Sequence, residues 1–70
     1  MSSGATPLSP RQISVLRLMA EGKRVREIAI ALCISERTVG NHISNIFYKL
    51  GIYDRAKAIV YAIKQGLIHP

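Results

Sequence analysis

Along most of this chain, apolar residues recur every three to four positions, a spacing that places apolar and polar residues on different faces of a helix. The stretch 36–50 shows the pattern most clearly. Its apolar residues recur at i, i+4, i+7 and i+11 and are Val39, Ile43, Ile46 and Leu50. Its polar residues with the same spacing on another face are Arg37, Asn41, Ser44 and Tyr48. The pattern predicts a helix with one buried face and one face that can form hydrogen bonds.

Capping residues mark where most of the helices begin and end. Ser9 and Gln12 can form a capping box for the first helix, and Ser35 and Asp54 are suitable N-caps further on. Arg24 is a poor cap for the second helix. Glycines suited to helix ends are Gly22, Gly51 and Gly66. We therefore predict an all-α, compact four-helix domain that contains a helix-turn-helix, with helices at about 10–21, 25–32, 36–50 and 55–65.

Length and charge narrow the choice of partner. Seventy residues allow one domain, and the small, polar residues 1–7 are expected to be a disordered arm or linker remnant before a domain at 8–70. Ten Lys and Arg against four Asp and Glu give a net charge of +6, which favours nucleic acid or an anionic membrane. No predicted helix sets a strongly basic face against a large aromatic and apolar one, so a membrane surface is disfavoured.

Other function classes lack the residues that they require. One cysteine cannot form a disulfide framework, and with two distant histidines it predicts no structural zinc site. The sequence offers no paired carboxylates and no nucleophile with a base, so we expect no enzyme, cofactor, metal or small-molecule ligand. An apolar run of about 18 residues and a signal peptide are both missing, which predicts a cytoplasmic protein.

Several short motifs occur in a fixed order along the chain, and they include Leu8-Ser9-Pro10-Arg11, Ala20-Glu21-Gly22, Glu27-Ile28-Ala29, Thr38-Val39, Lys49-Leu50-Gly51 and Asp54-Arg55-Ala56. In content and spacing they resemble the LuxR/GerE-type helix-turn-helix domain. This is the C-terminal output domain of NarL-type response regulators and related transcription regulators. The resemblance implies a bacterial DNA-binding domain that places its third helix in the major groove of double-stranded DNA.

The resemblance and the residue chemistry together give the expected DNA contacts. By position, the family pattern places Thr38, Gly40, Asn41, Ser44 and Asn45 against DNA, with Ser35 and Arg37 near phosphates. Asn41 is the best candidate for a base contact, because an amide can pair with two atoms of adenine. Asn45 and Lys49 are expected to contact phosphates. Arg24 could also hold a phosphate.

Three positions depart from the family pattern. Gly40 replaces a usual Lys, so one cation is missing from the expected DNA-binding helix, and a glycine there costs about 1 kcal/mol relative to Ala. It could instead allow the DNA to approach the backbone closely. Arg24 replaces a capping Ser or Thr. Gln12 replaces an acidic residue but still supports the capping box.

The fourth helix is apolar on two faces, which predicts two burial partners. The family pattern favours Ala58, Ile59 and Ala62 for the core. The second face contains Ala56, Val60, Ile63 and Leu67. Of these, Ala56, Val60 and Ile63 are the expected interface of a homodimer. The sequence alone also allows both faces to lie in the core.

Three further residues have simple structural interpretations. Cys33 in the turn is expected to be a small apolar filler, and His42 a packed or hydrogen-bonded histidine. Glu27 either faces solvent or pairs with Arg37 or Arg55.

The functional prediction is sequence-specific double-stranded DNA binding by a dimeric bacterial transcription regulator, with RNA polymerase as a candidate further partner. The alternative is a helical protein-interaction module with little or no DNA binding. The missing cation at Gly40 lends this alternative some support.

Overall fold

Four helices account for most of residues 8–68, the part of the chain that the computed structural model describes. They are α1 (Pro10–Ala20), α2 (Val25–Leu32), α3 (Glu36–Leu50) and α4 (Arg55–Lys64). Each agrees with its predicted range to within one residue, and no strand occurs between residues 8 and 68, so the all-α prediction is confirmed. The arm expected at 1–7 lies outside the described residues.

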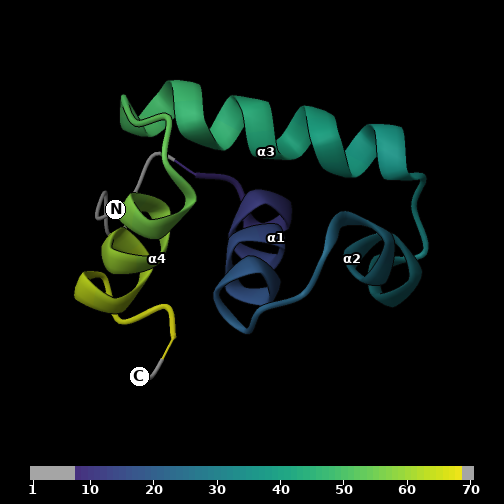
Figure 1. The fold of residues 1–70 in the computed structure, drawn as a ribbon, viewed down its shortest axis with the longest axis horizontal. Coiled ribbons are helices and arrows are strands. Elements are labelled where there is room, and N and C mark those ends of the chain that lie inside the picture. The colour runs from purple at the N-terminus through teal and green to yellow at the C-terminus, as the bar shows by residue number, and fades with distance from the viewer. Residues whose placement is uncertain (1–7, 69–70) are drawn as a thin grey trace.

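α1 is the centre of the arrangement, because it packs against each of the other three helices. α2 and α4 lie on opposite sides of α1, and α3 lies across the group along one edge (Figure 1). α2 also packs against α3, as expected for the two helices of a helix-turn-helix. This arrangement leaves the side of α3 that faces away from α1 uncovered.

The core beneath α3 is made of large side chains. Val39 and Ile46 of α3 are fully buried, together with Leu16 of α1 and Ile28 of α2. Burying a side chain of this size contributes about 1.5–3 kcal/mol, so α3 is held firmly against α1 and α2. The core residues that the structure describes are Leu8, Val15, Leu16, Met19, Ile28, Ala29, Val39, Ile46, Ala58 and Ala62.

The starts of α1 and α2 are capped in different ways. Ser9 Oγ accepts a hydrogen bond from the Gln12 N–H at 3.2 Å, and Gln12 Oε1 accepts from the Ser9 N–H at 2.9 Å. At α2, the Arg24 guanidinium has no acceptor atom, so it cannot cap the helix. Glu27 Oε1 instead accepts from the Arg24 N–H at 2.8 Å. Glu27 therefore supplies half of a capping box. Of its two expected alternatives, the solvent-facing one holds, because Glu27 is exposed and pairs with neither Arg37 nor Arg55 among residues 8–68.

The turn between α2 and α3 depends on Cys33, which adopts a left-handed conformation with φ of 57°. Its side chain is exposed, so the expectation of an apolar filler is wrong. Ile34 takes that role, because it packs against the core while its N–H donates to the Ala29 carbonyl at 3.0 Å. A non-glycine residue in this region carries some backbone strain, and the Ile34 contacts hold it there.

Two arginines connect α1 to the C-terminal part of the chain. Arg55 Nη2 donates to the carbonyl oxygens of Met19 and Lys23, both at 2.9 Å. These bonds satisfy carbonyls at the end of α1 and in the turn that follows. Arg17 Nε donates to the Leu67 carbonyl at 3.1 Å. Leu67 is half-buried and packs against the core, so its expected place on the outer face of the last helix is wrong.

Candidate nucleic-acid interface

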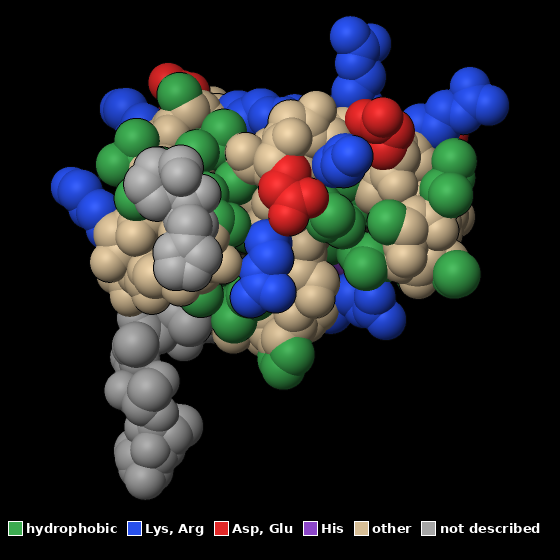
Figure 2. All heavy atoms as spheres, turned by 90° about the horizontal axis from the view of Figure 1, so that it is seen from below, with side chains coloured by type: hydrophobic (Ala, Val, Ile, Leu, Met, Phe, Trp, Pro, Cys, Tyr) green, Lys and Arg blue, Asp and Glu red, His purple; other side chains and the backbone are tan. Residues whose placement is uncertain are grey.

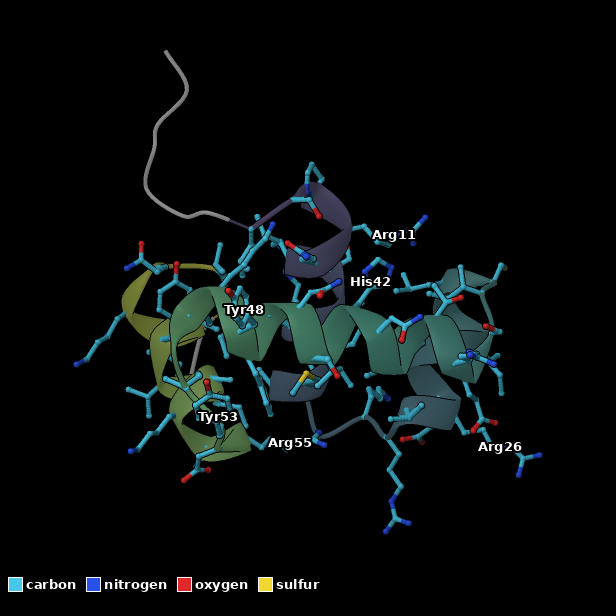
Figure 3. All side chains as sticks on the ribbon, turned by 90° about the horizontal axis from the view of Figure 1, so that it is seen from above. Arg11, Arg26, His42, Tyr48, Tyr53 and Arg55 are labelled. Atoms are coloured by element: carbon cyan, nitrogen blue, oxygen red, sulfur yellow. The ribbon has the colours of Figure 1, made fainter. Side chains whose placement is uncertain are left out.

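The outer face of α3 is polar and open to solvent. Val39 and Ile46 on its inner side are 0% exposed. The exposed polar residues of this helix beyond its first are Arg37, Asn41, Ser44, Asn45, Tyr48 and Lys49. Figure 3 looks down onto α3 from the side opposite the core. The helix thus offers amide, hydroxyl and guanidinium groups from a position fixed by the core.

At the start of α3, hydroxyl groups hold the first turn together. Ser35 Oγ accepts from the Thr38 N–H at 3.0 Å and donates to Thr38 Oγ1 at 2.9 Å. Ser35 is exposed, whereas Thr38 is half-buried. Arg37, next to this cap, is exposed, and no residue in the described range 8–68 accepts a hydrogen bond from its guanidinium. Its donors therefore remain free for a ligand at this end of the helix.

Gly40 leaves a gap in the face of α3. The glycine is half-buried and is not among the residues with positive φ. A Cβ built on it would meet no atom within 4 Å. Neither the backbone conformation nor the packing of this domain therefore requires glycine here.

At the other end of α3, Lys49 contacts a residue of α1. Lys49 Nζ donates to Gln12 Oε1 at 3.3 Å, and Gln12 is only 6% exposed. This contact gives Gln12 a second role besides the capping box that the sequence predicts, and the phosphate contact of Lys49 stays a prediction. Tyr48, which the spacing assigns to the polar face, is 80% exposed. His42 is half-buried at the side of the helix (Figure 3).

Further cations lie around the start of α2. Lys23, Arg24 and Arg26 are all exposed, and the Arg26 side chain extends away from the domain (Figure 3). On the face turned away from α3, Lys and Arg side chains lie beside acidic ones (Figure 2). The start of α2 therefore offers exposed cations in addition to those of α3.

The two faces of α4 differ in burial. Ala58 and Ala62 are 0% exposed, and Ile59 is half-buried. Val60 and Ile63 are 48% and 36% exposed, and Ala56 is also exposed. The alternative that both faces belong to the core is wrong. The role of Ala56, Val60 and Ile63 in a dimer stays a prediction.

Among residues 8–68, no group of three or more His, Cys, Asp or Glu side chains could hold a metal ion. None of the described helices has the length and apolar character that crossing a membrane requires.

A polar outer face on the second helix of a helix-turn-helix is typical of DNA-binding domains, and comparison with known proteins identifies which kind. Residues 6–62 match the family model GerE, described as bacterial regulatory proteins, luxR family. Spore germination protein GerE from Bacillus subtilis is 44% identical over 59 residues, which are 84% of this chain and 80% of that protein. Transcriptional regulatory protein DegU from Brevibacillus brevis is 48% identical over 61 residues, which are 87% of this chain and 26% of DegU.

Solved structures agree with these matches. The structure of the transcription factor GerE aligns with a TM-score of 0.79 at 38% identity, covering 86% of this chain and 90% of that one. The response regulator ChrA of a heme-sensing two-component system aligns with a TM-score of 0.80 at 41% identity, covering 90% of this chain and 31% of that one.

The chain belongs to the luxR family of bacterial regulatory proteins, which confirms the resemblance seen in the sequence. This is a family of DNA-binding transcription regulators and not of enzymes. The chain spans only 26–29% of the length of DegU and of two further transcriptional regulatory proteins from Bacillus subtilis.

Proposed function

We propose that this domain binds double-stranded DNA sequence-specifically, with α3 in the major groove, as the output domain of a bacterial transcription regulator. The observation that carries the proposal is the contrast across α3, where fully buried Val39 and Ile46 lie opposite an exposed polar face. A major groove about 12 Å wide accepts one α-helix, and the amides and hydroxyls on this face match the donors and acceptors of base edges.

Within this face, Asn41 and Ser44 are placed to read bases, and the Gly40 gap lies one residue from Asn41. Thr38 lies nearer the cap of the helix. The residues proposed to hold phosphates surround them and are Arg24, Ser35, Arg37, Asn45 and Lys49. Phosphate contacts fix the register of the helix on the duplex, and base contacts then select the sequence.

We further propose that the domain binds as a homodimer through α4. Val60 and Ile63 are exposed apolar residues on a helix whose other face is buried, and a second copy of the same face would cover them. Two reading helices related by a twofold axis bind half-sites about one helical turn apart. RNA polymerase is the proposed further partner, and a regulator that binds DNA and RNA polymerase would act in the bacterial cytoplasm.

Selection of bound duplexes from a random DNA pool tests this proposal. We expect enrichment of a sequence with two related half-sites, and an affinity that falls steeply as salt rises because phosphate contacts release counterions. The matched control is the same selection with Asn41→Ala, which should lose preference at one base pair of each half-site. If the domain bound no duplex from the pool even at low salt, the proposal would be contradicted and the protein-interaction module favoured.

A further inference from the structure

Gln12 is the only buried polar or charged side chain among residues 8–68. Its Oε1 atom accepts two hydrogen bonds, from the Ser9 N–H at 2.9 Å and from Lys49 Nζ at 3.3 Å. One amide oxygen therefore joins the start of α1 to the last turn of α3, across a sequence separation of 37 residues.

The chemistry of this contact depends on Gln12 being an amide. Gln and Glu both complete a capping box, because each can accept from the N-cap N–H. A carboxylate would also place a negative charge within hydrogen-bond distance of the Lys49 ammonium. That attraction would be strengthened because the acceptor is buried, where screening by water is weaker. The amide supplies the same geometry and adds no charge.

The difference between an amide and a carboxylate at residue 12 matters because of where Lys49 lies. Lys49 is exposed in the last turn of α3, on the helix that we propose enters the groove. Gly40 contributes no charge to this helix, so Arg37 and Lys49 are its only cations. Each cation that meets a phosphate adds about 0.9 to the slope of affinity against salt on logarithmic axes. Lys49 is therefore one of only two cations that α3 can contribute to phosphate binding, and a change in its charge would change the salt dependence of binding.

We propose that Gln12 is a positioning residue that fixes the Lys49 side chain at the last turn of α3 and places no negative charge beside the Lys49 ammonium. The buried amide thereby sets the strength and the salt dependence of binding to DNA phosphates. The inference rests on the DNA binding proposed above and assigns a specific role to a residue that does not itself touch DNA.

The test is Gln12→Glu, measured by fluorescence anisotropy with a selected duplex over a range of salt concentrations. We expect affinity to fall about 3- to 10-fold at about 0.1 M salt, and the salt slope to become shallower by about 0.9. The thermal unfolding midpoint should be unchanged or higher, because the capping box is kept and an ion pair is gained. A folded variant with weaker, less salt-dependent binding is the predicted result.

Gln65→Glu is the matched control, because it makes the same change of amide to carboxylate. Gln65 is the exposed C-cap of α4, and that end of α4 points away from α3 (Figure 1). It should change affinity less than twofold and leave the slope unaltered. An equal loss in both variants would show a general effect of net charge and overturn the proposal, as would an unchanged slope in Gln12→Glu.

A double variant tests whether the effect passes through Lys49. In a Lys49→Gln background, Gln12→Glu should cause no further change in slope, because the cation that it neutralises is gone. A full second loss in that background would contradict the proposed route. Failure of the proposed function gives a different result, since the unmodified chain would then show no salt-dependent binding to any duplex.

Discussion

α3 and α4 both bury one side in the domain and expose the other, but the two exposed sides differ in chemistry. The exposed side of α3 contains Arg37, Asn41 and Ser44. That of α4 contains Val60 and Ile63. A polar side is well solvated in water and can exchange its hydrogen bonds to water for hydrogen bonds to base edges. An apolar side is instead stabilised when another apolar surface covers it. The difference in chemistry supports the two proposed partners, which are DNA for α3 and a second subunit for α4.

The buried sides differ as well. α3 is anchored by Val39 and Ile46, which are large and fully buried, whereas the fully buried residues of α4 are Ala58 and Ala62. Alanines allow two helices to approach closely but bury less apolar area per residue. The helix proposed to read DNA therefore has larger anchoring side chains than the helix proposed to dimerise. Contacts to base edges require that α3 keep a fixed position in the domain.

The largest expected effect comes from removing an anchor of α3. Ile46→Ala should lower the free energy of unfolding by about 2–5 kcal/mol. A 70-residue domain has about 3.5–10 kcal/mol in total, so much of this variant would be unfolded. Thermal or urea denaturation followed by circular dichroism measures the loss. Val60→Ala on the exposed side of α4 is the control and should stay within about 0.5 kcal/mol. Similar losses at both positions would remove the contrast between the helices.

The next largest effect concerns the exposed face of α3. Asn41→Ala should weaken binding to the selected site by about 1–3 kcal/mol, because a lost base contact costs this much, and leave the unfolding midpoint unchanged. The control is Asn45→Ala, which removes the same group one turn further along. As a proposed phosphate contact, it should weaken binding evenly across sequences. Anisotropy with selected and scrambled duplexes measures both, and equal losses on both duplexes for Asn41→Ala would mean that Asn41 does not read bases.

A charged residue introduced on the exposed face of α4 tests whether this face forms the dimer. Val60→Glu should raise the dissociation constant of the dimer at least about tenfold, because two like charges would meet near the twofold axis in an apolar interface. The monomer should remain folded. Gln65→Glu on the same helix adds an equal charge outside the proposed interface and should leave dimerisation intact. Sedimentation at high protein concentration separates the outcomes, and an unaltered profile for Val60→Glu would rule out this face.

The smallest effect is at Gly40. Gly40→Ala should raise the free energy of unfolding by about 1 kcal/mol, since the glycine lies in a regular helix and an added Cβ meets no atom within 4 Å. The urea midpoint measures this gain. An unchanged urea midpoint would contradict the claim that Gly40 destabilises α3 relative to alanine.

Local sequence signals were sufficient to predict the four helices. The side chains of Ser9, Ser35 and Asp54 each cap the helix that they were expected to cap, and Gly22 and Gly51 adopt positive φ. These are interactions between near neighbours in sequence. The left-handed turn at Cys33 was missed because a cysteine carries no local preference for that conformation.

Contacts between helices were not predictable in the same way. The bonds from Arg55 to Met19 and Lys23, and from Lys49 to Gln12, join residues 32 to 37 positions apart. They depend on where packing places each side chain, and no periodicity encodes that. The polar face of α3 was visible from spacing, whereas the buried acceptor next to Lys49 required the fold.

The most direct measurement of the central claim, that the outer face of α3 meets DNA, is an amide chemical-shift titration of the ¹⁵N-labelled domain with a short duplex. The largest shifts should fall on Arg37, Gly40, Asn41, Ser44 and Asn45, with smaller ones at the start of α2 and little change in α4 beyond what dimerisation causes. Largest shifts on α1 or α4, with α3 unmoved, would contradict the account.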